Sequence, residues 1–274
     1  DKFNMHDGAL VSMDPQTGEV LALVGAWDPS DPNIGQVGLA TSRLQPGSTI
    51  KLFTYTAAIA SRQYTMHSPI VDSTLKLKQS DGRIYQPLNY DRSYHGTCEL
   101  QVCFGNSFNI PAVKTEAKVG IPYITDMEIA AGLTSLAAPD NRPAADSYAA
   151  TLGALHYGVS PLELANGVST LASLGVHHDV APVLTISDRS DGHVIYAHDP
   201  VAESQRVIPD NAAFITAAIT SNDANRVREF GAHGLLTLPD RKVSAKTGTT
   251  EDFSSNWTVG YTPQLVSVIV VANP

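Results

Sequence analysis

A serine and a lysine three residues apart, Ser48 and Lys51, have the types and spacing of a nucleophile and its base. A serine hydroxyl attacks a carbonyl carbon only when a neighbouring base takes its proton. No histidine lies within a few residues of Ser48, which leaves Lys51 as the local general base. A lysine with its usual pKa of about 10.4 is protonated at neutral pH. The pair therefore predicts acyl transfer through Ser48, in surroundings that lower the pKa of Lys51.

A second motif, Ser107-Phe108-Asn109, offers a hydroxyl and an amide to the same chemistry. We expect Ser107 to relay a proton between Lys51 and the leaving group. Asn109 is expected to bind a substrate amide, because its side chain carries both a carbonyl and an NH2 group. The alternative for this motif is a turn between two helices without a chemical role.

A third motif, Lys246-Thr247-Gly248-Thr249, combines a cation with two hydroxyls. Such a set can bind a carboxylate, as at a peptide C-terminus. Lys246 would also lower the pKa of Lys51 by like-charge repulsion if the fold brings them together. In an edge strand, Gly248 would leave room for a ligand backbone. The alternative for Lys246 is a solvated charge at a strand end.

Each motif alone is weak evidence for a site. The order of the three along the chain distinguishes them from similar motifs that occur by chance. A second Ser-x-x-Lys, residues 73–76, lies where apolar and charged residues alternate, so in a strand its ends point to opposite faces. A second Ser-x-Asn occupies residues 254–256. The alternative for Ser48 is a helix N-cap without a chemical role, but its place in the ordered set favours a nucleophile. The backbone N–H groups of Ser48 and Thr249 are the expected oxyanion-hole donors.

Strands at both ends of the chain are expected to position these motifs. Residues 9–14 and 19–25 have the pattern of two strands joined by a turn at residues 15–18. The third motif is itself expected in a strand, and it precedes two more strand-like runs, residues 256–261 and 265–272. We expect all five strands to pair in one antiparallel sheet. Ser48 follows a turn signal and opens an apolar run that predicts a buried helix.

Local signals predict further elements between these ends. Thr125 and Glu128, like Ser160 and Glu163, have the spacing of a capping box at a helix start. Pro161 suits the first position of the second helix, and Gly175 is expected to stop it. Residues 183–186 and 194–197 flank a turn and predict a surface hairpin.

Composition excludes several classes of function. The 274-residue chain has a net charge of −9 and no basic cluster, which argues against nucleic acid. No run of about 18 apolar residues is present to span a bilayer. We expect no metal or other cofactor, because His177 and His178 lack a carboxylate or cysteine at ligand spacing, and a surface loop is expected there.

The two cysteines, Cys98 and Cys103, are predicted to be free thiols. If Thr97 caps a helix through both, their Cα atoms lie roughly 8–9 Å apart. A disulfide needs less than about 7 Å. A distorted helix start is the arrangement that would allow a bridge.

The three motifs, in this order, resemble the signatures of penicillin-binding proteins and serine β-lactamases. Further stretches resemble the transpeptidase domain of class A, bifunctional penicillin-binding proteins over nearly the whole chain. These stretches are residues 9–18, 43–49, 89–91, 109–114, 159–163 and 257–263. The resemblance implies an α/β fold of the α+β type, in which helices flank a central five-stranded antiparallel sheet and form an all-helical lobe. The usual C-terminal helix is expected to be missing.

The resemblance implies one transpeptidase domain over residues 1–274, with strand-rich ends (1–30, 240–274) and a mostly helical middle (48–225). It implies a serine D,D-transpeptidase that cross-links peptidoglycan stem peptides and is inhibited by β-lactams through acylation of Ser48. The donor would be a D-Ala-D-Ala end and the acceptor an amine. A D,D-carboxypeptidase, a β-lactamase and a non-catalytic β-lactam sensor or scaffold remain alternatives.

The same resemblance places the protein on the extracytoplasmic face of the bacterial membrane. Family members carry a membrane helix and a glycosyltransferase domain ahead of this region. We therefore expect an excised part of a membrane-anchored parent, with no membrane contact from the fragment itself.

Overall fold

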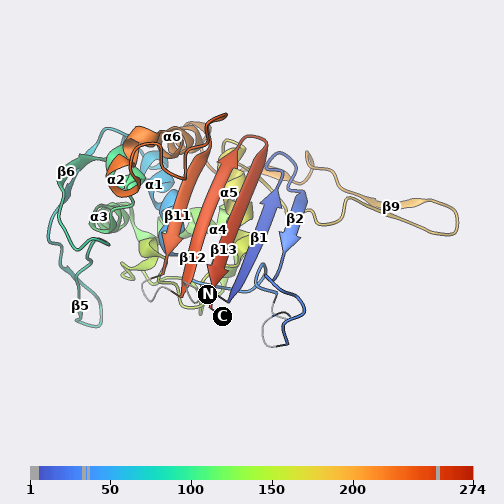
Figure 1. Ribbon diagram of the computed structural model, residues 1–274, viewed down its shortest axis with the longest axis horizontal. Helices are drawn as coiled ribbons and strands as arrows, with labels where there is room; N and C mark the ends of the chain where they lie inside the picture. The colour runs from blue at the N-terminus through green and yellow to red at the C-terminus, as the bar shows by residue number, and fades with distance from the viewer. Residues whose placement is uncertain (1–5, 33–34, 36–37, 251–253, 274) are drawn as a thin grey trace.

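Strands from the two ends of the chain form one sheet in this computed structural model, which describes residues 6–32, 35, 38–250 and 254–273 (Figure 1). The sheet is antiparallel, as expected. In spatial order its strands are β11 (Ser244–Thr249), β12 (Ser255–Thr262), β13 (Leu265–Ala272), β1 (Asp7–Met13) and β2 (Val20–Val24). The motif strand β11 is thus an edge strand. Of the predicted strand-rich ends, residues 1–5, 251–253 and 274 lie outside the described residues.

Alternating apolar side chains set the register of this sheet. Along β1 every second residue is buried, and Val11 lies opposite Val268 of β13. A shift of one residue would turn these side chains away from the core. Helices cover this buried face, and α5 (Pro161–Ala172) packs directly on β13 and β1. In Figure 1, α5 lies behind the sheet.

The helix that follows Ser48 runs through the centre of the molecule. A short 3-10 helix, η1 (Gly47–Ile50), leads into α1 (Lys51–Ala60), as the apolar run predicts. Nearly all of α1 is buried, which is the pattern of a helix enclosed on all sides. The other helices are α2 (Leu100–Gly105), α3 (Asn109–Val119), α4 (Ile121–Ala131), α6 (Asp210–Thr220) and α7 (Val227–Phe230), with 3-10 turns η2 (Thr134–Ala137), η3 (Ala150–Leu152) and η4 (Asp223–Asn225).

One predicted capping box is confirmed and the other is wrong. Ser160 and Glu163 cap α5 reciprocally, with Pro161 in its first turn, and α5 ends at Ala172, three residues before Gly175. Thr125 and Glu128 instead lie inside α4, which begins at Ile121 after a positive-φ glycine. Glu128 is buried in the helical lobe, and this burial raises its pKa to about 8.

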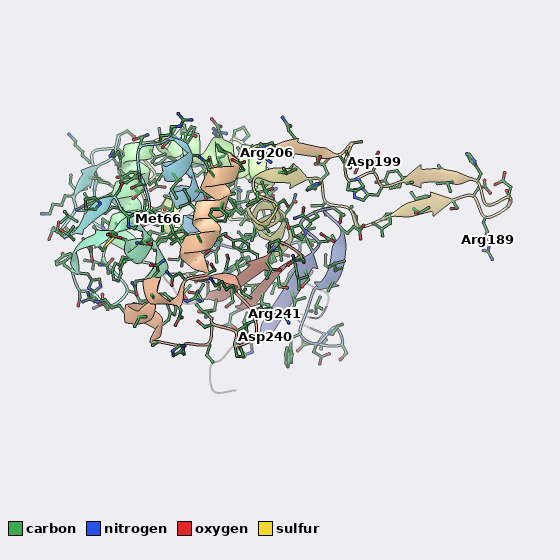
Figure 2. All side chains as sticks on the ribbon, turned by 90° about the horizontal axis from the view of Figure 1, so that it is seen from above. Met66, Arg189, Asp199, Arg206, Asp240 and Arg241 are labelled. Carbon is green, nitrogen blue, oxygen red and sulfur yellow. A yellow bond between two sulfur atoms is a disulfide. The ribbon has the colours of Figure 1, made fainter. Side chains whose placement is uncertain are left out.

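Four two-stranded ribbons complete the described part of the fold. They are β3 (Pro69–Asp72) with β6 (Gly96–Glu99), β4 (Leu77–Lys78) with β5 (Ile84–Tyr85), β7 (Val176–His178) with β10 (Ser204–Arg206), and β8 (Thr185–Ser187) with β9 (Val194–Ala197). The last pair confirms the predicted hairpin, which projects far from the body with Arg189 at its tip (Figure 2). His177 and His178 lie in β7, so the surface loop expected there is wrong.

The free-thiol prediction is also wrong, because Cys98 and Cys103 form a disulfide. Cys98 is not helical: it pairs with Ile70 as part of β6, and α2 begins only at Leu100. The change from strand to helix brings the two Cα atoms to 5.7 Å, well inside bridging range. The bridge closes the junction that leads through α2 to the second motif.

Candidate active site

Lys51 is a buried lysine whose partners come from the second motif. Its side-chain nitrogen donates to the Ser107 carbonyl at 2.6 Å and to Asn109 Oδ1 at 2.7 Å, with the Ser107 hydroxyl at 3.4 Å. Loss of hydration, then the charge of Lys246, lower the pKa of Lys51 well below its usual value. Within the described chain, none of its hydrogen bonds goes to Ser48. Ser48 itself is partly exposed one helical turn earlier.

Lys246, from β11, reaches the same Ser107 hydroxyl. Its side-chain nitrogen donates to Ser107 Oγ and to the Thr247 carbonyl, both at 2.8 Å. Burial lowers the pKa of Lys246 to about 7, while the charge of Glu229 raises it. The Ser107 hydroxyl thus lies between two lysines that give up protons easily. Such an arrangement can pass a proton from one side of the site to the other.

The backbone of Ser107 is unusual as well. The residue sits in the turn between α2 and α3 with a φ of +60°, in the left-handed region. That conformation costs a non-glycine residue about 1–2 kcal/mol. Strain of this kind collects at functional sites, where the surroundings hold the residue in place. Here it lets Ser107 present both its carbonyl and its hydroxyl to lysines.

Asn109 is held in place by Asn89, which belongs to one of the stretches that carry the family resemblance. Asn89 Oδ1 accepts from the backbone N–H of Asn109 at 2.8 Å, and its NH2 group donates to the buried Asp72 at 2.7 Å. The Asn109 side chain binds Lys51 through its oxygen and the Leu88 carbonyl through its NH2 group. One lone pair and one N–H of this amide are left for a substrate.

Glycines let the backbone of η1 touch the backbone of β11. A side-chain carbon at Gly47, whose φ is +55°, would lie 2.8 Å from the Thr249 nitrogen. A side-chain carbon at Gly248 would lie 2.4 Å from the Pro46 carbonyl oxygen. Gly248 therefore makes room for the backbone at the start of η1. That it also makes room for a ligand stays a prediction. The contact brings Ser48 and Thr249, the two expected oxyanion donors, to adjoining segments.

A cleft of about 620 Å³ joins the three motifs. Ser48, Ser107, Asn109, Thr247 and Thr249 all line it. Thr247 and Thr249 alternate with Lys246 along the strand and reach the cleft from the face opposite Lys246 and Gly248.

Glu229 of α7 also lines this cleft, and no sequence motif marks it. Burial, followed by the charge of Asp91, raises the pKa of Glu229. The sequence does not show that this carboxyl group lines the cleft, because its position depends on how α7 packs in the folded chain. In the part of the chain that the structure describes, no three His, Cys, Asp or Glu side chains form a metal-binding group.

Comparison with known proteins agrees with this geometry. The family model for the penicillin-binding protein transpeptidase domain matches residues 8–274. The chain belongs to this family. The transpeptidase-domain relatives include penicillin-binding protein 1B of Haemophilus influenzae, 29% identical over 264 residues, and penicillin-binding protein 1A of Neisseria flavescens, 31% identical over 269 residues. Both matches cover 96% of this chain and 32% of the relative, so the chain spans about a third of their length. These relatives make it a transpeptidase domain of the class A type.

Solved structures of the transpeptidase family share the fold. The penicillin-binding protein PonA1 from Mycobacterium tuberculosis superposes with a TM-score of 0.79 at 26% identity, covering 97% of this chain and 68% of that one. Penicillin-binding protein 1A from Haemophilus influenzae gives 0.78 at 23% identity, covering 97% and 43%. The expected five-stranded sheet with flanking helices is thereby confirmed. Among the described residues, no helix has the length and apolar character needed to cross a membrane.

Proposed function

We propose that this chain is a serine D,D-transpeptidase domain, acting as one catalytic unit, in which Ser48 is acylated by the D-Ala-D-Ala end of a peptidoglycan stem peptide. The observation that carries the proposal is the Lys51–Ser107–Lys246 chain of hydrogen bonds beside Ser48. Both lysines have pKa values lowered by burial, so one of them can act as a base near neutral pH.

Acylation starts when the uncharged Lys51 takes the proton of the Ser48 hydroxyl. The Ser48 oxygen then forms a bond to the carbonyl carbon of the donor peptide. Negative charge on the carbonyl oxygen is stabilised by the backbone N–H groups of Ser48 and Thr249. As the peptide bond breaks, the proton held by Lys51 passes through Ser107 to the leaving D-Ala amine. Lys246 supports this relay through its hydrogen bond to Ser107.

The terminal carboxylate of the donor would bind Thr247 and Thr249, with Lys246 supplying positive charge. A penicillin carries a carboxylate in the same relation to its reactive amide, and its acylation of Ser48 would follow the same route. PonA1 of Mycobacterium tuberculosis has also been solved in complex with penicillin V, which supports the proposal by analogy.

An amine of a neighbouring stem peptide would complete the reaction by attacking the acyl-enzyme. Water as the acceptor would make the chain a D,D-carboxypeptidase, and rapid hydrolysis of a penicillin adduct would make it a β-lactamase. A stable adduct without peptide turnover would favour a sensor or scaffold. The parent protein would be membrane-anchored and face the peptidoglycan on the extracytoplasmic side.

Intact-mass measurement after incubation with a penicillin tests the central step. We expect one adduct per chain, mapped to Ser48 by peptide analysis, because Ser48 alone combines the helix start, the lysine and the oxyanion donors. Ser48→Ala should abolish the adduct while leaving the thermal transition in place. Ser73→Ala is the matched control from the second Ser-x-x-Lys and should react normally. An adduct that persists on Ser48→Ala, or maps to Ser73, contradicts the proposal.

A further inference from the structure

We propose that Glu229 binds the ammonium group of the amine acceptor and so favours transfer of the acyl group to an amine over transfer to water. This inference rests on the proposed transpeptidase function and assigns the acceptor side of the same cleft. Glu229 lines that cleft together with Ser48 and Ser107. Among the described residues, its carboxylate has no hydrogen-bond or ion-pair partner, so its acceptor oxygens are available to a ligand.

The backbone around Glu229 is fixed, which is what a binding residue requires. The Glu229 N–H donates to Asn106 Oδ1 at 2.9 Å, and the Asn106 NH2 group holds the Asn225 carbonyl at 2.8 Å. Arg226, at the start of α7, is buried and donates to the Thr220 carbonyl and the Asp223 carboxylate. Asn106 directly precedes Ser107. The same turn therefore positions the proton relay and the carboxylate.

The cleft is lined by charges of both signs. Glu229 and Asp91 line it and are close enough to influence each other, Arg92 lines it as a cation, and His95 lies near Glu229. Thr247 and Thr249 line the same cleft, and Lys246 lies on the opposite face of their strand. Glu229 also interacts with the charges of Lys51 and Lys246. The cleft thus offers positive charge to a donor carboxylate and negative charge to an acceptor cation.

The chemistry of the second half-reaction calls for such a group. A primary amine with a pKa of about 10 enters as ammonium at neutral pH, so a carboxylate raises its local concentration. One proton must then go to an uncharged lysine before the nitrogen can attack. The new C–N bond forms, the bond from carbon to Ser48 Oγ breaks, and the second proton of the amine passes through Ser107 to Ser48. Water, the competing acceptor, carries no charge, so a carboxylate that binds ammonium does not assist its attack.

The ratio of products tests Glu229 directly. The chain is acylated with a D-alanyl thioester and offered either acetyl-lysine amide, whose amine is charged, or hydroxylamine, which is neutral near pH 7. For Glu229→Gln we expect the ratio of aminolysis to hydrolysis to fall roughly five- to tenfold with the lysine amide, a typical size for a partly exposed charge contact. The fall should appear as a raised KM for the amine, be smaller in Glu229→Asp, and diminish at high salt. The ratio with hydroxylamine should stay unchanged.

A matched control and the penicillin adduct separate the possible failures. Asp240→Asn alters an exposed carboxylate that pairs with Arg241, labelled beside it in Figure 2, and that does not line the cleft. It should change neither ratio. Equal effects of Glu229→Gln on both nucleophiles, or no effect on either, would overturn the role of Glu229 while the adduct on Ser48 still upheld the proposed function. No adduct on the unaltered chain would overturn both.

Discussion

Lys51 and the β8–β9 hairpin represent two opposite ways of building part of this molecule. Lys51 is fully buried, and its hydrogen bonds join α1 to the turn before α3 and to the first residue of α3. The hairpin is exposed along both strands, and hydrogen bonds such as that from the Asp188 N–H to the His193 carbonyl link it to itself. A substitution in the cleft should therefore alter the charge or position of several neighbouring groups. A substitution in the hairpin should affect only the hairpin itself.

Substitution of Lys51 gives the largest effect expected within this comparison. Lys51→Ala should slow formation of the penicillin adduct by at least a few hundredfold, because loss of a general base costs about 10²–10⁴ in rate. Lys51→Arg should recover little, since a guanidinium stays protonated in proteins. The second-order rate of adduct formation measures both. If the arginine variant reacts at nearly the normal rate, the base lies elsewhere.

Thr249→Val should have an intermediate effect, because it removes a hydroxyl and leaves the lysines in place. A hydrogen bond to a charged group contributes about 1.5–3 kcal/mol, so acylation efficiency should fall roughly ten- to a hundredfold. A penicillin ester without the free carboxylate should react poorly with the unaltered chain and be nearly indifferent to Thr249→Val. Equal reactivity of ester and acid with the unaltered chain would refute carboxylate binding here.

Glu128 extends the comparison to stability. Its pKa is about 8 in the folded chain and near 4.5 when unfolded, so between these values the folded state holds an extra proton. The free energy of unfolding should therefore fall as the pH rises through this window. Glu128→Gln should flatten the fall in melting temperature but not remove it, because burial also raises the pKa of Glu116.

The hairpin offers the matched control for this experiment. Asp191→Asn changes an exposed carboxylate near the hairpin tip and should leave the pH dependence of the melting temperature as it was. If Glu128→Gln leaves that dependence equally unchanged, Glu128 does not hold the extra proton.

Shortening the hairpin should have the smallest effect. The His198 N–H donates to the Leu184 carbonyl at 2.9 Å, so an Asn-Gly turn can join these two residues in place of residues 185–197. We expect the rate of penicillin adduct formation to be unchanged and the melting temperature to move by only a few degrees, the effect of about 1 kcal/mol or less. A large loss of either would mean that the hairpin supports the cleft.

The sequence predicts the parts of this molecule that local pattern decides. Strand-like apolar runs are enough for four of the five sheet strands, and the third motif indicates the edge strand. The spacing of Ser160 and Glu163 is enough for one helix start. Thr125 and Glu128 have the same spacing, yet Gly120 starts α4 earlier, and a capping pattern cannot show that. Local pattern also fails where a segment far away in the sequence determines the backbone conformation or the position of a residue.

Cys98 and Glu229 illustrate that limit. Cys98 is extended because β3 pairs with it, a contact between segments about 30 residues apart. Glu229 reaches the cleft because Asn106 holds its backbone, across more than 120 residues. The order of the three motifs points to Ser48, Lys51, Ser107 and Lys246 as site residues. Only the packing of α2, α7 and β11 gives the hydrogen bonds between them and the carboxylate beside them.

The central position of β13 has a consequence for how the chain folds. β13 lies between β12 and β1, and Asp7 is opposite Ala272, so the two halves of the sheet join through a pairing of segments that lie far apart in the sequence. Closing such a distant pairing is entropically costly and slow. Until it occurs, β1 has a vacant edge that can pair with another chain. We expect refolding to be slow and its yield to fall with protein concentration, as a dilution series from denaturant would measure. The edge strand β11, which carries Lys246, becomes part of a five-stranded sheet only when β13 pairs with β1.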